Sequence, residues 1–214
     1  MKFVIIRHGQ TVSNENGTFT GRTDAELSSI GKNQAQLLCD YLFKTYSFSK
    51  IFTSPLKRAV DTITPLCSQL KISPVKEQSF IEIDGGDFEG LTSKELLERF
   101  PKEFGLWQTD VGKSKCPNGE DFNDVTKRAV GKILELAQNP DDLGETILIF
   151  THAGVVRAIT CYFSGIPVKD LASIPWAPNA SITEIIFDGK NFSFGKIRQD
   201  DYLLGQVSYL SKGF

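Results

Sequence analysis

Short apolar runs alternate with amphipathic segments along most of the chain. The runs are rich in Val, Ile and Phe and are bounded by polar residues, which is typical of buried strands. They lie at 2–6, 50–53 and 145–151. The amphipathic segments repeat apolar residues every three or four positions, which predicts helices that bury one face. They lie at 26–46 and 121–138.

Local start and stop signals predict further helices. Ser54-Pro55 offers an N-cap followed by proline at the first helical position, so we expect a helix to begin there. Another helix is expected from Gly154. A short helix over 92–100 should end at Pro101, because proline breaks a helix that reaches it.

These elements predict an α/β fold with a mostly parallel sheet between two layers of helices, a three-layer α/β/α sandwich. Continuous apolar strands separated by helices are typical of such sheets. Asp188-Gly189, between the runs 181–187 and 192–197, is a hairpin signal, so an antiparallel strand is expected at one edge. The polar loop 111–121 separates two stretches of the same pattern, and we expect a single domain over 1–214.

Composition narrows the class of protein without indicating a function. The 214 residues are 40% hydrophobic and 23% charged, which excludes a disordered or fibrous chain. A net charge of −2 gives no basic surface for nucleic acid or an anionic membrane, so neither is expected as a partner. No apolar run is long enough for a signal peptide or a membrane helix, and we expect a cytoplasmic protein. Scattered cysteines without a CxxC pair are expected to be reduced thiols; they are Cys39, Cys67, Cys116 and Cys161.

Several common catalytic motifs are absent. Gly112-Lys113-Ser114 resembles the end of a phosphate-binding P-loop, but Trp107 stands where that loop needs glycine. There is no GxSxG, HExxH or GxGxxG motif, and no cysteine is followed six residues later by arginine. No DxD pair follows an apolar strand, so a magnesium-dependent aspartyl phosphatase is not expected.

The chain holds only two histidines, His8 and His152, and each lies just after a predicted strand. Because ligands of open parallel sheets bind beyond the carboxyl ends of the strands, both imidazoles are candidates for one pocket. Arg58, near the start of the helix that follows the strand 50–53, should reach the same rim. A lone histidine after a strand is more often a structural polar residue, but this combination favours a catalytic site.

Two arginines beside two imidazoles suit a phosphoryl group. The guanidinium groups of Arg7 and Arg58 offer planar donor pairs that match phosphate oxygens. A helix N-terminus adds unpaired backbone N–H groups. A neutral imidazole is a nucleophile that can accept the phosphoryl group covalently.

A series of short motifs runs in order along the chain. They are Arg7-His8-Gly9-Gln10-Thr11 with Asn14, Gly21-Arg22-Thr23-Asp24, Ser54-Pro55-Leu56-Lys57-Arg58-Ala59, Glu82-Ile83-Asp84-Gly85-Gly86-Asp87-Phe88-Glu89-Gly90, Gly119-Glu120, His152-Ala153-Gly154 and Asn179-Ala180-Ser181. The series resembles the histidine phosphatase superfamily, also called phosphoglycerate mutase-like, over nearly the whole chain. The resemblance implies one domain of that fold over 1–214, with a lid or insertion at about 83–120.

The resemblance also implies roles for the matching residues. His8 would be the nucleophile that becomes phosphohistidine. Glu82 would be the general acid that protonates the leaving group and then the base that activates water. Arg7, Arg58 and His152 would clamp the phosphoryl oxygens. Neither a metal nor another cofactor is implied.

Other matching residues are weaker candidates for binding phosphate or the substrate body. Asn14 would contribute a side-chain contact, and Ala153 its backbone N–H. Arg22 could reach the substrate body, while Thr23 is more typical of a loop or cap. Glu120 is expected to cap the helix that follows it. Aromatic residues near the lid are expected to pack in the core, with a substrate wall as the second reading; they are Phe80, Phe88, Phe104 and Trp107.

Members of this family either hydrolyse a phosphomonoester or move phosphate within a phosphoglycerate. The mutases carry a long insertion with paired arginines after the acid glutamate, whereas residues 83–117 hold a single arginine, Arg99. A compact lid with few cations favours a metal-independent phosphatase over a cofactor-dependent phosphoglycerate mutase. The chain is similar to short bacterial phosphatases, so alpha-ribazole 5′-phosphate and phosphoserine are candidate substrates.

Two alternatives stay open at this point. A catalytically inactive relative that binds a phosphorylated partner would need the arginine clamp, but not His8 or Glu82. The hairpin and the residues 203–214 could join a homodimer or cover the pocket, and the sequence does not choose between these roles.

Overall fold

The computed structural model describes residues 1–139 and 142–205. In this part of the chain a six-stranded sheet has the strand order β3-β2-β4-β1-β5-β6. The strands are β1 (Lys2–Arg7), β2 (Lys50–Thr53), β3 (Val75–Lys76), β4 (Thr146–Thr151), β5 (Ile182–Phe187) and β6 (Phe192–Phe194). The first four pair in parallel, and β5 and β6 are antiparallel. The expected mixed sheet with an antiparallel edge is confirmed.

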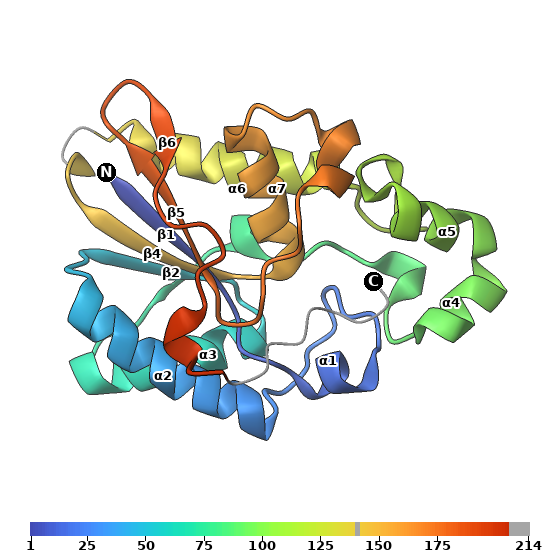
Figure 1. Cartoon of the computed structure of the whole chain (residues 1–214), viewed down its shortest axis with the longest axis horizontal. Coiled ribbons are helices and arrows are strands. Elements are labelled where there is room, and N and C mark those ends of the chain that lie inside the picture. Colours follow the sequence, from blue (N-terminus) through green and yellow to red (C-terminus); the bar gives the residue numbers. More distant parts are fainter. Residues whose placement is uncertain (140–141, 206–214) are drawn as a thin grey trace.

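Helices cover both faces of the sheet (Figure 1), as expected for a three-layer sandwich. The long helices α2 (Ser29–Thr45) and α3 (Lys57–Leu70) lie on one face. On the other face lie α6 (Phe122–Ala137) and α7 (Ala153–Phe163). The paired contacts α2 with α3 and α6 with α7 hold each layer together.

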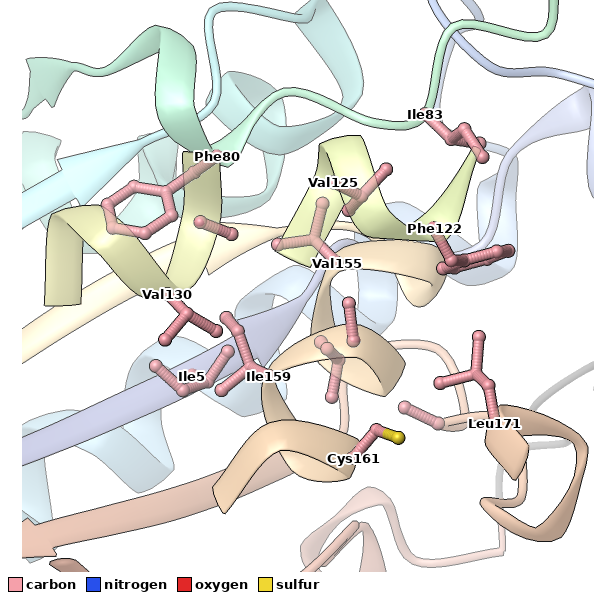
Figure 2. Close-up of a cluster of buried hydrophobic side chains, with 14 of the residues drawn as sticks. Ile5, Phe80, Ile83, Phe122, Val125, Val130, Val155, Ile159, Cys161 and Leu171 are labelled. Atoms are coloured by element: carbon pink, nitrogen blue, oxygen red, sulfur yellow. The ribbon is translucent and has the colours of Figure 1, made fainter. Parts of the chain in front are cut away.

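Each face of the sheet contributes to its own hydrophobic core. In β1, Phe3 and Ile5 pack in the core on the α6 and α7 side, whereas Val4 and Ile6 pack in the core on the α2 and α3 side. Figure 2 shows part of the first core, with Ile5 close to side chains from both α6 and α7. Because both faces of a central strand are buried, its sequence is a continuous apolar run rather than an alternating one.

Smaller elements gather beyond the carboxyl ends of the parallel strands (Figure 1). Three short α-helices lie there: α1 (Val12–Asn16), α4 (Ser93–Arg99) and α5 (Pro101–Thr109). The connecting turns include 3₁₀ helices, which are η1 (Gln78–Phe80), η2 (Gly86–Phe88), η3 (Val111–Lys113), η5 (Val168–Ser173) and η6 (Asp201–Leu203). The segment 83–120 thus consists of two short helices and turns at this end of the sheet.

One expected helix boundary was wrong, and another was confirmed. Helix α3 begins at Lys57, and its N-cap is Leu56, which makes no side-chain capping bond. The Ser54 hydroxyl lies 2.6 Å from the Nε2 of His152 and accepts the backbone N–H of Leu56 at 3.3 Å, so it joins His152 to the turn before α3. Pro101 does follow the end of α4, but it also opens α5, since proline is well suited to the first helical position.

Two further observations bear on the sequence-based expectations. Within the described residues, no helix is long and apolar enough to cross a membrane. Of the segment 203–214, which we expected either to join a dimer or to cover the pocket, residues 206–214 lie outside the described residues.

Candidate active site

The parallel pairing of β1 and β4 brings the two histidines together. Arg7 and Thr151 are register partners at the ends of these strands, so His8 and His152 both follow at the same edge of the sheet. Their ring centroids are 5.1 Å apart. Two residues separated by most of the chain therefore share one site because two neighbouring strands end together.

His8 presents an unprotonated ring nitrogen. Its Nδ1 lies 2.7 Å from the carbonyl oxygen of Gly9, and because a carbonyl can only accept, Nδ1 carries the proton. The Nε2 is then free as a nucleophile. Burial, together with the charges of Arg58 and Arg7, holds the pKa of His8 well below its usual value of 6.5. The imidazole is neutral at pH 7 as a result.

Arg58 connects His152 to the strand-end loops. Its Nε donates to the Nδ1 of His152 at 3.2 Å, so the His152 proton is on Nε2 and is donated to Ser54. The two terminal nitrogens of Arg58 donate to the carbonyls of Thr23 (2.9 Å) and Gly21 (2.5 Å). Burial and Arg58 lower the pKa of His152 well below 6.5. His152 is fully buried, and its Nδ1 holds the Arg58 guanidinium in place by accepting this hydrogen bond.

Arg7 lies at the bottom of the pocket on β1. One terminal nitrogen donates to the carbonyl of Ala177 at 2.6 Å. Its Nε is buried and has no acceptor among the described residues. Burial lowers the pKa of Arg7 to about 10, so the guanidinium remains charged at neutral pH. A buried cation with an unused donor is suited to an anionic ligand.

Glu82 faces these cations from the segment between η1 and η2. Its carboxylate accepts the backbone N–H of Ile83 at 2.9 Å and that of Gly154 at 3.2 Å. Burial raises the pKa of Glu82, although these two N–H groups and Arg58 act in the opposite direction. A Cβ on Gly154 would lie 2.5 Å from a Glu82 oxygen, so glycine is required for this approach.

Arg128 of α6 holds the segment that carries Glu82. Its terminal nitrogens donate to the carbonyls of Ser79 (3.0 Å), Ile81 (2.5 Å) and Glu82 (3.1 Å). It also pairs with Glu120, donating at 3.1 and 3.0 Å. Sequence reasoning missed Arg128, because an arginine in an amphipathic helix carries no local sign of such a role.

Glu120 does not cap α6, contrary to expectation. Asp121 is the N-cap, and its carboxylate accepts from Asn123 and Asp124. The Glu120 carboxylate instead binds Arg128, accepts the N–H of Asp84 and pairs with Arg22 at 3.1 Å. It is part of the framework around Glu82.

The pocket that these side chains form is lined by residues that lie far apart in the sequence. They are Arg7, His8, Thr11, Asn14, Thr18, Phe19, Thr20, Arg58, Glu82, Ile83, Trp107, Ala153, Gly154 and Trp176. Asn14 and Ala153 therefore line the pocket together with four of the five expected catalytic residues. Ala153 is the first residue of α7, so its N–H has no partner within the helix. Thr11, which also lines the pocket, is the N-cap of α1.

Arg22 and Thr23 do not line this pocket. The Arg22 guanidinium pairs with Asp84 and Glu120, each at 3.1 Å. Thr23 contributes its carbonyl to Arg58 and its N–H to Glu89. Both residues therefore belong to the loop that supports Arg58.

The aromatic residues in and near the segment 83–120 divide between core and pocket. Phe80, Phe88 and Phe104 are fully buried, as expected for core residues. Trp107 is also buried, yet one part of it lines the pocket. Sequence reasoning missed Phe19 and Trp176, which stand in loops without a motif.

Among residues 1–139 and 142–205, no group of three or more His, Cys, Asp or Glu side chains is arranged to hold a metal ion. The four cysteines, all within this part of the chain, are free thiols.

A mostly parallel sheet that helices cover on both faces, with two imidazoles and two guanidiniums at its carboxyl edge, defines an α/β protein with a cationic pocket. The model of the histidine phosphatase superfamily (branch 1) matches residues 3–200, and the chain belongs to that family. "Phosphoserine phosphatase 1" of Hydrogenobacter thermophilus is 29% identical over 185 residues, 86% of each chain.

Solved structures share the fold. YhfR of Bacillus stearothermophilus is 27% identical, with a TM-score of 0.88 over 94% of this chain and 98% of that one. The alpha-ribazole phosphatase of Shigella flexneri is 24% identical, with a TM-score of 0.82 over 93% and 96% of the two chains, a likeness of fold alone.

Proposed function

We propose that the chain is a phosphatase that hydrolyses a small phosphomonoester through a phosphohistidine on His8, without a metal ion. The observation that carries this proposal is a neutral His8 with an unprotonated Nε2, in one pocket with Arg7, Arg58 and Glu82. The pocket thus combines a nucleophile, two cations for the phosphoryl oxygens and a carboxyl group with a raised pKa.

In the first step the Nε2 lone pair of His8 attacks phosphorus, and the bond between phosphorus and the ester oxygen breaks. The ester oxygen leaves with the proton of the Glu82 carboxylic acid, so the product is a neutral alcohol. Arg7 and Arg58 stabilise the charge on the three phosphoryl oxygens. The Ala153 N–H and the Asn14 side chain are further donors for these oxygens.

In the second step the Glu82 carboxylate takes a proton from water while the water oxygen attacks phosphorus. The bond from phosphorus to Nε2 breaks, and its electron pair returns to His8. Inorganic phosphate leaves, and Glu82 is again an acid. Each residue ends in its starting state, as catalysis requires.

A phosphoglycerate mutase is the alternative within the family. It would need further cations for the substrate carboxylate and second phosphate. Arg99 is exposed and lies over the ring of Phe100 at 5.6 Å, and it is not among the residues lining the pocket. This favours the phosphatase. An inactive binding module is disfavoured, since it would not need both His8 and Glu82.

A phosphate-release screen with EDTA present tests the proposal. It would include p-nitrophenyl phosphate, alpha-ribazole 5′-phosphate, phosphoserine and 3-phosphoglycerate. We expect release that His8→Ala lowers by about a thousandfold or more, since the nucleophile is lost. Interconversion of 2- and 3-phosphoglycerate without release would instead identify a mutase, and no turnover of any compound would favour a binding module.

A further inference from the structure

Charge is unevenly distributed in the pocket. Apart from His8, the described residues of the lining include three ionisable side chains: Arg7, Arg58 and Glu82. The proposed reaction uses all three at the phosphoryl group. A phosphoryl dianion therefore balances the two guanidiniums. No cation of this lining remains for a second anionic group on the substrate.

Two arginines next to the lining already donate to protein oxygens, Arg22 to two carboxylates and Arg157 to two backbone carbonyls. The Arg22 guanidinium binds the carboxylates of Asp84 and Glu120. Arg157 of α7 donates to the carbonyls of Ile174 (2.6 Å) and Ala172 (3.2 Å). Neither lines the pocket.

Three of the residues that line the pocket are aromatic, Phe19, Trp107 and Trp176, and we call them the aromatic wall. The rings of Phe19 and Trp107 are in edge contact, with centroids 5.2 Å apart. The fully buried Phe122 contacts both tryptophans. Its ring centroid lies 5.7 Å from that of Trp107 and 6.5 Å from that of Trp176. Ile83 adds an aliphatic surface beside them.

Trp176 is held in place although it is only partly buried. The Arg157 guanidinium lies 4.2 Å from the centroid of its ring, a cation–π contact. Because Arg157 is itself fixed by two carbonyls, the indole has a rigid support on that side. The polar, uncharged part of the lining consists of Thr11, Asn14, Thr18 and Thr20.

We infer that the organic body of the substrate is an uncharged, flat aromatic group, which the aromatic wall selects through Trp176. This inference rests on the proposed function and names the class of substrate for it. An aromatic ring in the organic part of the substrate would gain contact with the indole rings of the pocket. A carboxylate or second phosphate would lose its hydration without gaining a cation, which is unfavourable.

Three phosphate esters of alcohols separate the effect of the ring from the effect of an added charge: benzyl phosphate, 4-carboxybenzyl phosphate and ethyl phosphate. We expect kcat/KM for benzyl phosphate to exceed that for each of the others by about tenfold, a typical effect for an added apolar contact or an unpaired charge. Trp176→Leu should remove most of the advantage of benzyl phosphate over ethyl phosphate, since the ring contact is lost.

Tyr162→Leu is the matched control. Tyr162 is an exposed aromatic residue of α7 outside the pocket lining, and its loss should leave all three values unchanged. Equal values for benzyl and ethyl phosphate, an advantage for 4-carboxybenzyl phosphate, or an unchanged advantage in Trp176→Leu would overturn the inference.

Binding of benzylphosphonate and ethylphosphonate, followed by calorimetry, separates this inference from the proposed reaction. Selective binding of benzylphosphonate that Trp176→Leu abolishes, without turnover of any ester, would reject the phosphatase but retain the aromatic selection. Turnover without any preference for the ring would retain the phosphatase and reject the selection.

Discussion

In the proposed mechanism Glu82 decides which substrates can react, because an alkoxide needs a proton to leave and a weakly basic phenolate does not. Burial raises the pKa of Glu82, so its acid form persists to higher pH than that of an ordinary glutamic acid. The low pKa of His8 keeps the nucleophile neutral over the same range.

The first residue-scale prediction concerns pH. The acid form of Glu82 declines as pH rises through its raised pKa, so phosphorylation of His8 by an alkyl phosphate should be faster at pH 5–6 than at pH 8–9. Single-turnover rates of alcohol release measure this step. A rate that climbs steadily from pH 5 to 9 would contradict the assignment of Glu82.

The second residue-scale prediction uses Glu82→Gln. Loss of the acid should lower His8 phosphorylation by alkyl phosphates by about 10²–10⁴-fold. Phosphorylation by p-nitrophenyl phosphate should be far less affected, because nitrophenolate leaves without a proton. Hydrolysis of the phosphohistidine should still slow, because Glu82 no longer activates water. A burst of nitrophenolate should therefore precede slow turnover. Equal losses for both esters in stopped-flow experiments would count against an acid role.

At the scale of elements, the first turn of α7 and the Glu82 segment must approach closely. Gly154→Ala places a Cβ 2.5 Å from a Glu82 oxygen, so it should displace the carboxylate and lower kcat for alkyl phosphates at least tenfold. Gly131→Ala in α6 is the control, because its added Cβ meets no atom within 4 Å. It should keep full activity and raise the free energy of unfolding by up to about 1 kcal/mol. Unaltered alkyl phosphate turnover in Gly154→Ala would show that this contact is not needed.

Helix α6 positions the same segment from the other side. Arg128→Gln removes three bonds to backbone carbonyls, so we expect a larger loss of kcat for alkyl phosphates than for p-nitrophenyl phosphate. The apparent pKa for the alkyl ester should rise, because Arg128 lowers the pKa of Glu82. Lys127→Gln removes an exposed charge from the same helix and should change neither value. A uniform loss with both esters and an unchanged pH profile would indicate a merely structural role.

The whole molecule should lose stability on mild acidification. His8 and His152 are buried and neutral, and their pKa values lie well below 6.5, so the unfolded chain takes up more protons as pH falls. Glu82 has the opposite sign, because its pKa is raised in the folded state. With two histidines against one carboxyl group, the free energy of unfolding in urea should decrease from pH 7 to pH 5. A constant or rising value would contradict the burial of both imidazoles in their neutral form.

Much of this molecule could be predicted from its sequence, because its strands and motifs are local signals. The run 2–6 and the helix over 121–138 follow from apolar periodicity, and the two histidines follow from their places after strands. Trp176 and Arg128 could not be found in this way. Their roles depend on contacts with distant residues, such as Arg157 beneath the indole and the carbonyls near Glu82. The start of α3 was misplaced for the same reason, since Ser54 is used by His152.

The most direct test of the central proposal is to trap the phosphoenzyme. Rapid alkaline quenching of the Glu82→Gln variant with p-nitrophenyl phosphate, followed by mass spectrometry of peptides, locates the phosphoryl group. We predict one phosphoryl group on His8, which is absent when His8→Ala is added to the same variant. A phosphoryl group on another residue, or product release without any labelled intermediate, would contradict a reaction through His8.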